Sequence, residues 1–257
     1  MAATVLGSGA ASEELRKGVA PGAKLRVGKV LDDEGSGYTS DIIAGMEWAG
    51  RSGAKVVNMS LGGGATDGTD VSSQALNQIS RTTGTLFVVA AGNSGPGSGT
   101  VGFPGAADEA LTVPAVDRED KMASFSSRGP RVGDGAFKPD IAASGVGTVA
   151  ARAAGTAMGT VVDEHCTRAD GTSMATPHVA GAAALIAQQR PDAAAAGRAS
   201  SRWPGRPGHR ASRPPRHTAS RSQRGTEVPD QRPARGGYRR SRRTVVSSGS
   251  WPGGGAR

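Results

Sequence analysis

The sequence predicts an α/β fold with three layers, in which a mostly parallel sheet carries helices on both faces. Two observations predict it. Short β-prone runs alternate with amphipathic helical stretches, a pattern typical of right-handed βαβ units. The strand candidates, such as Thr85–Ala91, are apolar without alternation, as expected of strands buried on both faces. Ligands bind beyond the carboxyl ends of the strands in such sheets, so we expect the functional residues there.

Each element is indicated by its own local pattern. A first strand is predicted within residues 25–31, and Ser40 is placed to cap the helix after it, with Gly53 suited to that helix's C-terminus. Further strands are predicted at 55–59, 85–91 and 111–116, and a second helix at 71–83, stopped near Gly84. Two loops of small residues, Ser60–Gly64 and Gly92–Gly95, come directly after strands and lie where we expect the chemistry.

Composition divides the 257 residues into two domains. Residues 1–196 have a net charge of −4, whereas residues 197–257 carry 15 Arg and two acids, which accounts for the overall +9. The second segment contains no Leu, Ile, Met or Phe. Such a segment buries too little apolar surface to offset the entropy of ordering it. We therefore predict a folded domain over 1–196 and a disordered Arg/Pro/Gly-rich tail over 197–257.

Several classes of protein are excluded. A single cysteine, Cys166, cannot form an internal disulfide. No run of about 18 apolar residues predicts a membrane helix, and residues 1–20 lack the pattern of a signal peptide. The forty glycines have no collagen period.

The most informative stretch is Gly171–Gly181, which reads Gly-Thr-Ser-Met-Ala-Thr-Pro-His-Val-Ala-Gly and runs into a helix-forming segment. Pro177 is tolerated in the first turn of a helix, which predicts a helix start near residues 174–176. Ser173 then lies at a loop-to-helix junction, near unpaired N–H groups that can stabilise an anion. Taken alone, Ser173 is more simply read as a helix cap, since caps are far commoner than nucleophiles.

This eleven-residue string closely resembles the nucleophile motif of the subtilisin-like serine peptidases, the subtilases. The likeness extends in the family's order over roughly residues 2–192. It is carried by Gly18–Ala23, Val57–Gly63, Ala90–Gly95, Phe125–Pro130 and Lys138–Ile141.

The resemblance implies a partial subtilisin-like fold and a set of roles. Ser173 would be the acylating nucleophile of a serine endopeptidase, and the Asn93 amide would donate to the oxyanion beside the Ser173 N–H. Ser60, Leu61 and Gly62 would pair with the substrate backbone as an added strand. The pocket for the side chain before the scissile bond would be walled by Ala90, Ala91 and Gly92. Without the resemblance, Asn93 is a turn residue and Ser60–Gly64 a flexible turn.

A serine nucleophile needs a base that takes its proton and a carboxylate that orients this base. Neither is found in the motifs in which the family carries them. The family carries them in Asp-Thr/Ser-Gly and His-Gly-Thr-His motifs, neither of which occurs here. The four histidines are His165, His178, His209 and His217. On a helix, His178 would point roughly 140° away from Ser173, and nothing recommends His165. We therefore expect an inactive or very weak peptidase, since triad loss leaves roughly 10³–10⁴-fold catalysis over water.

The two ends of the chain suggest how this arose. Ala2–Ser12 resembles the segment directly after the histidine motif in the family, so we hypothesise that the reading frame begins inside the gene at Met1. A change of frame near residues 193–197 would explain the arginine-rich tail. Pro114, Ser144 and Asp170 depart from the family pattern as well. The Asp170 carboxylate is expected to oppose negative charge at a nearby oxyanion site.

Two other functions stay open: a non-catalytic peptide-binding remnant that uses the Ser60 strand, and polyanion binding by the tail. The expected partner is a polypeptide substrate, with no membrane, and with nucleic acid only through non-specific attraction to the arginines. No metal ligand is assigned and no cofactor is predicted, although the resemblance allows structural calcium. Members of the family are usually secreted, whereas the chain as written, without a signal peptide, would stay in the cytoplasm.

Overall fold

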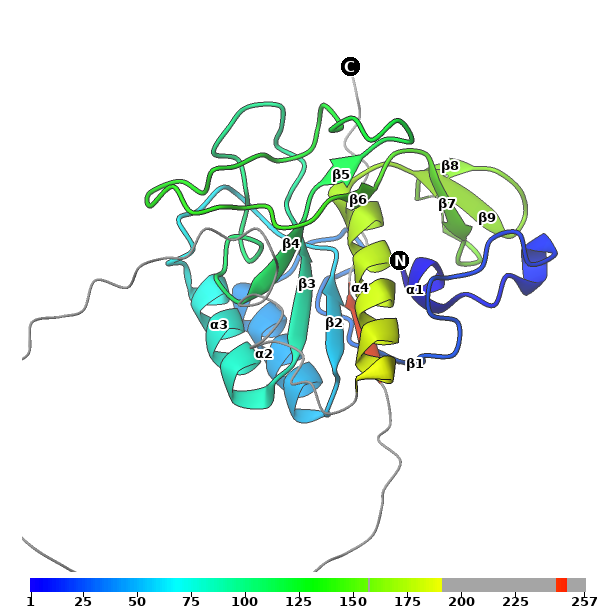
Figure 1. Ribbon diagram of the computed structural model, residues 1–257. Coiled ribbons are helices and arrows are strands. Elements are labelled where there is room, and N and C mark those ends of the chain that lie inside the picture. Colours follow the sequence, from blue (N-terminus) through cyan, green and yellow to red (C-terminus); the bar gives the residue numbers. More distant parts are fainter. Residues whose placement is uncertain (157, 191–243, 249–257) are drawn as a thin grey trace, which may run out of the picture.

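A five-stranded parallel sheet forms the centre of the molecule (Figure 1). The computed structural model describes residues 1–156, 158–190 and 244–248. The strands lie in the order β1-β10-β2-β3-β4, and all neighbouring pairs are parallel. They are β1 (Lys24–Val27), β10 (Thr244–Ser248), β2 (Val56–Met59), β3 (Leu86–Ala90) and β4 (Ala110–Val113). The predicted parallel α/β architecture is confirmed.

Helices cover both faces of this sheet (Figure 1). On one face lie α2 (Thr39–Arg51) and α3 (Val71–Thr83). On the other lies α4 (Thr172–Gln189), which packs on β2 and β3, with the short helix α1 (Ala2–Leu6) against it. A 3₁₀ turn, Ala10–Ser12, comes after α1.

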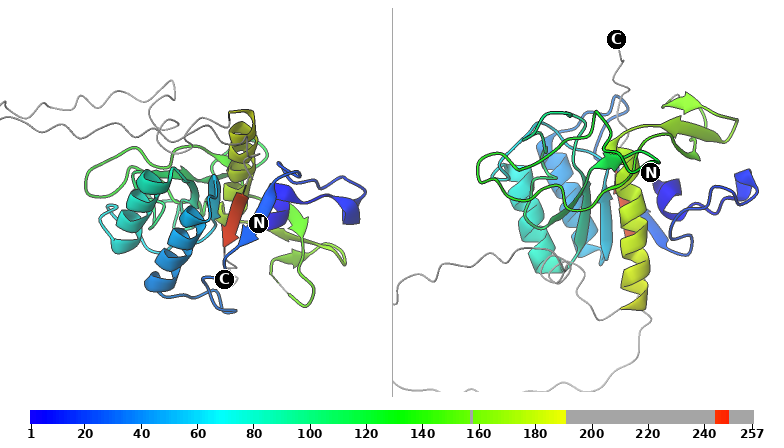
Figure 2. Two further views of the ribbon diagram at one scale, coloured as in Figure 1. Left: turned by 90° about the horizontal axis from the view of Figure 1, so that it is seen from below. Right: turned by 45° about the horizontal axis from the view of Figure 1, so that its top comes forward.

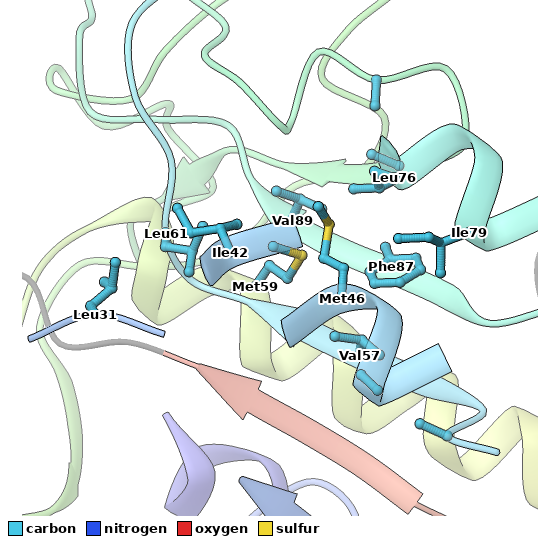
Figure 3. Packing of buried hydrophobic residues seen from close by; sticks show 14 residues of the cluster. Leu31, Ile42, Met46, Val57, Met59, Leu61, Leu76, Ile79, Phe87 and Val89 are labelled. Atoms are coloured by element: carbon cyan, nitrogen blue, oxygen red, sulfur yellow. The ribbon is translucent and has the colours of Figure 1, made fainter. Parts of the chain in front are cut away.

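Two hydrophobic clusters hold the layers together. The side chains of β2 alternate between the two clusters. Val57 and Met59 belong to the cluster under α2 and α3, and Val56 belongs to the cluster under α4. In the first cluster, Phe87 and Val89 of β3 lie opposite Met46 of α2 (Figure 3). All residues of β2 and β3 are buried, which confirms that these strands are covered on both sides.

Two smaller sheets complete the described fold. The strands β5 (Ala115–Val116) and β6 (Ala143–Ser144) form a parallel pair. The strands β7 (Thr148–Ala151), β9 (Cys166–Ala169) and β8 (Thr160–Val161) form an antiparallel sheet in that order.

Helix boundaries confirm some sequence expectations and correct others. Helix α3 spans the predicted residues 71–83, with Asp70 accepting the Ser73 N–H at its start and Gly84 in the left-handed region (φ 69°) at its end. Helix α2 begins earlier than predicted: its N-cap residue is Tyr38, so Ser40 lies inside the first turn and does not cap it. At its other end Gly53 has a φ of 75°, as predicted for a helix terminus.

Two strand predictions are too long. The first strand stops at Val27, where Gly28 packs against the Trp48 ring. The predicted strand 111–116 is split into β4 and β5 at Pro114. Proline has no N–H to donate to a ladder, so pairing is interrupted there.

The tail contributes one element, which the sequence analysis did not assign. Residues 244–248 form β10, between β1 and β2 in the sheet (Figure 2). The other residues of the predicted disordered tail lie outside the described ranges. Within the described residues, no helix is long and apolar enough to cross a membrane.

Candidate active site

A small cleft, open to solvent, lies at the carboxyl ends of β2 and β3. Its lining comes from three parts of the chain that are far apart in the sequence. These residues are Leu61, Gly62, Gly63, Ala90, Ala91, Gly92, Asn93, Ser94, Gly102, Phe103, Thr172 and Ser173. Seven of the eight site residues predicted from the sequence line this cleft, and the eighth, Ser60, contacts Ser173.

Helix α4 begins at Thr172, earlier than the predicted 174–176, and contains Pro177 beyond its first turn. Proline cannot donate the i→i−4 bond, so it leaves the Ser173 carbonyl without its helical partner. The Ser60 hydroxyl donates to that carbonyl at 2.8 Å. A side chain from β2's carboxyl end thus replaces the missing helical bond, which is why the proline is tolerated inside this helix.

The bond between these two serines is reciprocal. The Ser173 hydroxyl donates to the Ser60 carbonyl oxygen at 3.3 Å, and the Asn58 amide donates to the Ser60 hydroxyl at 3.0 Å. Ser60 is fully buried and Ser173 is 5% exposed. The hydroxyl of Ser173 is therefore held at the edge of the cleft by the loop after β2.

Asn93 is oriented by the residue that starts α4. Its side-chain oxygen accepts from both the N–H and the hydroxyl of Thr172, each at 2.9 Å. The side-chain nitrogen is thereby turned to the other side. A Cβ atom placed on Gly171 would lie 3.6 Å from Asn93 Nδ2 and 3.7 Å from the Ser173 backbone nitrogen. Both nitrogens thus lie within 4 Å of the same point, where Gly171 has no side chain and Met174 Sδ lies 3.4 Å away.

The structure adds lining residues that sequence reasoning missed. Phe103 lies against the loop after β2: its ring occupies the space that a Cβ on Gly63 would need, 2.2 Å away. The Gly63 N–H donates to the Phe103 carbonyl at 2.9 Å. Thr172 belongs to the Gly171–Gly181 string and was within reach of the sequence analysis, whereas Phe103 carries no local signal.

Neither of the two histidines that the structure describes forms a hydrogen bond with the Ser173 hydroxyl. His178 Nδ1 pairs with the Met174 carbonyl oxygen of its own helix at 3.0 Å, and burial lowers the pKa of this imidazole from its usual 6.5. His165 is exposed in the turn before β9. His178 is therefore a packing residue, as predicted, and His209 and His217 lie outside the described ranges.

The carboxylate of Asp170, which directly precedes Gly171, is engaged elsewhere. Asp170 is exposed, and its carboxylate accepts the backbone N–H of Gly147. Among the described residues, no three His, Cys, Asp or Glu side chains gather as a metal site would require, so no calcium ligand is assigned.

Comparison with known proteins identifies the family. The model of the subtilase family matches residues 1–203. Pyrolysin from Pyrococcus furiosus is 39% identical over 199 residues, which cover 66% of this chain. The serine protease AprX from Bacillus subtilis is 40% identical over 214 residues, which cover 74% of it. The structure of the patellamide maturation protease PatA superposes with a TM-score of 0.61 at 28% identity and covers 74% of the chain.

The chain belongs to the subtilase family of serine peptidases. It spans 14% of pyrolysin, 48% of AprX and 64% of the PatA chain. It therefore corresponds to less than two thirds of each of these relatives.

Proposed function

We propose that this chain carries the nucleophile and the oxyanion-binding side of an endopeptidase site, with Ser173 as the residue that is acylated. The observation that carries the proposal is the convergence of Ser173 and Asn93, eighty residues apart in the sequence, on one cleft. A helix cap alone gives no reason for a second, distant amide nitrogen to face the same point beside Gly171.

In the proposed reaction, Ser173 Oγ bonds to the carbonyl carbon of a peptide as its proton leaves. The carbonyl oxygen becomes negative and is stabilised by Asn93 Nδ2–H and the Ser173 N–H. Collapse of this intermediate breaks the C–N bond, and the amine takes up a proton. Water then releases the acyl group and restores the hydroxyl.

The step that this chain supports poorly is removal of the Ser173 proton. The hydroxyl's partner is the Ser60 carbonyl, which accepts a hydrogen bond but is far too weakly basic to take the proton at neutral pH. No described residue gives this hydroxyl a more basic hydrogen-bond partner, so we propose that solvent takes the proton. We accordingly propose very weak peptidase activity, limited to the roughly 10³–10⁴-fold that binding and an oxyanion hole supply without a triad.

Substrate binding is proposed to use the loop after β2. Ser60, Leu61 and Gly62 precede the point where the backbone starts to pair with Phe103, at Gly63. An extended peptide would lie along these three residues as an added strand. Its side chain before the scissile bond would enter the space walled by Ala90, Ala91 and Gly92. The proposed partner is a polypeptide.

A fluorophosphonate probe tests this function. The attacking oxygen displaces fluoride from phosphorus, so labelling reports nucleophilicity without requiring amide turnover. We expect slow covalent labelling of Ser173 that is lost in Ser173→Ala. The matched control is Ser72→Ala, because Ser72 is also buried at the second position of a helix, α3.

Labelling that survives Ser173→Ala would overturn the proposal. Folded protein that takes up no label at all would instead favour the non-catalytic peptide-binding function.

A further inference from the structure

One wall of the cleft consists of two segments that pair with each other. The Gly63 N–H donates to the Phe103 carbonyl at 2.9 Å, and the Phe103 N–H donates to the Gly64 carbonyl at 3.1 Å. The Gly102 N–H also reaches the Ala91 carbonyl, at the end of β3, at 3.0 Å. The Phe103 ring lies on Gly63, so the position of the turn that carries Phe103 decides the shape of this wall.

That turn continues into the interior and ends at a buried cation. The Ala106 N–H donates to the Gly102 carbonyl at 3.0 Å, and the Ala107 N–H donates to the Pro104 carbonyl at 3.0 Å. Both alanines are fully buried. Arg131 Nη1 donates to the Ala106 carbonyl oxygen at 2.6 Å. The turn therefore begins in the cleft lining and ends at the Arg131 guanidinium.

The Arg131 guanidinium is held firmly in place. Its side chain is 8% exposed, whereas the side chains of its acidic partners, Asp108 and Asp134, are each more than half exposed. Asp134 accepts two hydrogen bonds from the guanidinium, one with each carboxylate oxygen, and such two-point pairs fix orientation as well as distance. The Arg131 hydrogen bond lowers the pKa of Asp134 to about 2, so the pair is ionised at neutral pH.

A second loop of the cleft region passes over the same guanidinium. A Cβ atom on Gly68 would lie 2.8 Å from Arg131 Nη1 and 2.9 Å from the Ala106 carbonyl oxygen. Gly68 follows the substrate-lining loop after β2, and the Thr66 N–H donates to the Val101 carbonyl at 3.3 Å. Both segments that form the wall of the cleft are thus in contact with Arg131 at their far ends.

An ion pair on the same segment shows the contrast. Arg81 bridges to Glu109 at 3.0 Å, but its side chain is 56% exposed, and exposed ion pairs contribute little. Arg131 differs because it is buried and because it donates to a backbone carbonyl that would otherwise be shielded from water without a partner.

We propose that Arg131 is a positioning residue for the substrate: it fixes the turn of residues 102–107 from behind, and with it the wall formed by Gly63 and Phe103. Arg131 is not among the described residues that line the cleft, so it acts through this turn. The inference rests on the proposed function for the use of the cleft, whereas the contacts of Arg131 do not depend on it.

Hydrogen exchange of the full chain tests the hold on the wall. Arg131→Gln removes the charge and the two-point pair with Asp134. We expect the amides of Gly63, Gly102 and Phe103 to exchange roughly 10- to 100-fold faster, as expected for loss of a hydrogen bond from a charged group, while the amides of α2 keep their rates. Mass spectrometry of proteolytic fragments measures both regions in one experiment.

Asp134→Asn is the second variant, because it changes an exposed side chain and leaves the core intact. It should accelerate the same three amides roughly 2- to 10-fold through the weakened hold on the guanidinium. The matched control is Arg81→Gln, which removes the exposed ion pair to Glu109 and should change none of these rates. Unchanged exchange at the three amides in both variants, equal acceleration in α2, or an equal effect of Arg81→Gln would overturn the proposal.

Labelling by a peptidyl fluorophosphonate tests the consequence for the substrate. For Asp134→Asn we expect the half-saturating probe concentration to rise about 3- to 10-fold, with less than about a twofold change in the maximal rate of labelling at Ser173. Simple loss of stability would instead reduce the amount of protein labelled and leave the half-saturating concentration unchanged. That outcome, or a fall in the maximal rate alone, would overturn the positioning role.

The two measurements separate this inference from the proposed function. Native protein that takes up no peptidyl probe would refute the reactive Ser173, and the exchange rates would still decide whether Arg131 holds the wall. Faster exchange at Gly63, Gly102 and Phe103 would then support the inference, and unchanged exchange would refute it.

Discussion

At the scale of single residues, the site depends on how the backbone of Ser173 is satisfied inside α4. Pro177 removes one helical donor, and the Ser60 hydroxyl takes its place at the Ser173 carbonyl. The Ser173 hydroxyl in turn donates a hydrogen bond to the Ser60 carbonyl oxygen in the same loop. The loop after β2 and Ser173 are thus fixed to each other by two hydrogen bonds, both away from solvent.

Removing the Ser60 hydroxyl should therefore be costly. We expect Ser60→Ala to lower the free energy of unfolding by about 1–3 kcal/mol, because it leaves a buried carbonyl unsatisfied. Chemical denaturation measures it. The control is Ser52→Ala, whose hydroxyl also donates to a helix carbonyl, Ala49, but in a half-buried position. An equal, small loss in both variants would contradict this account.

Thr172 should act as a positioning residue for Asn93. Thr172→Val keeps the backbone donor to Asn93 Oδ1 but removes the hydroxyl donor. A lost hydrogen bond of about 0.5–1.5 kcal/mol predicts a roughly 2- to 10-fold slower reaction of Ser173 with a fluorophosphonate.

Asn93→Leu should slow the same reaction by about 10²–10³-fold if the amide stabilises the forming charge. Thr176→Val is the control, because that hydroxyl bonds only to the Thr172 carbonyl within α4. An unchanged rate in Asn93→Leu would refute the oxyanion role.

His178 should make stability depend on pH. Burial lowers its pKa below the usual 6.5, so the folded state favours the neutral ring. This contribution is present above about pH 6.5 and is lost as pH falls through the lowered value. We expect His178→Gln to flatten the decline of the unfolding midpoint between pH 7 and 5, and His165→Gln, at an exposed site, to leave it unchanged. The reverse pattern would contradict the assignment.

At the scale of elements, the sequence predicted the helices and strands whose pattern is local. It did not predict helix boundaries or cleft residues that depend on contacts between distant parts of the chain. Helix α3 was predicted with its observed bounds because its apolar residues recur at helical spacing and Gly84 follows its last turn. The start of α4 was misplaced because the rule about Pro177 assumes that no distant group compensates, and Ser60 does. Phe103 reaches the cleft through a contact with Gly63, which no periodicity encodes.

Apolar residues buried between the central sheet and helices α2 and α3 stabilise the fold. Phe87 on β3 is fully buried in the cluster beneath α2 and α3 (Figure 3). Phe87→Ala should lower the free energy of unfolding by about 3–5 kcal/mol through lost burial and a cavity. Phe137→Ala, at a side chain that is 80% exposed, is the matched control. Comparable losses from both would show that the core has been misassigned.

At the scale of the whole molecule, the distribution of charge separates the C-terminal segment from the rest of the chain, whereas the structure does not separate them completely. The basic excess lies in residues 197–257, and yet five of these residues lie in the central sheet. Strand β10 could not be assigned from its sequence, since a two-valine run among arginines and glycines is a weak signal. Its partners, β1 and β2, come from the start of the chain.

We propose that Ser173, Asn93 and the loop after β2 form one reactive site. A crystal structure of the full chain with a peptidyl boronic acid is the decisive experiment. We predict a tetrahedral boron bonded to Ser173 Oγ, one boron oxygen facing Asn93 Nδ2 and the Ser173 N–H, and the peptide extended along Ser60–Gly62. A boronate bound at another residue, or one whose oxygen points away from Asn93, would contradict the claim.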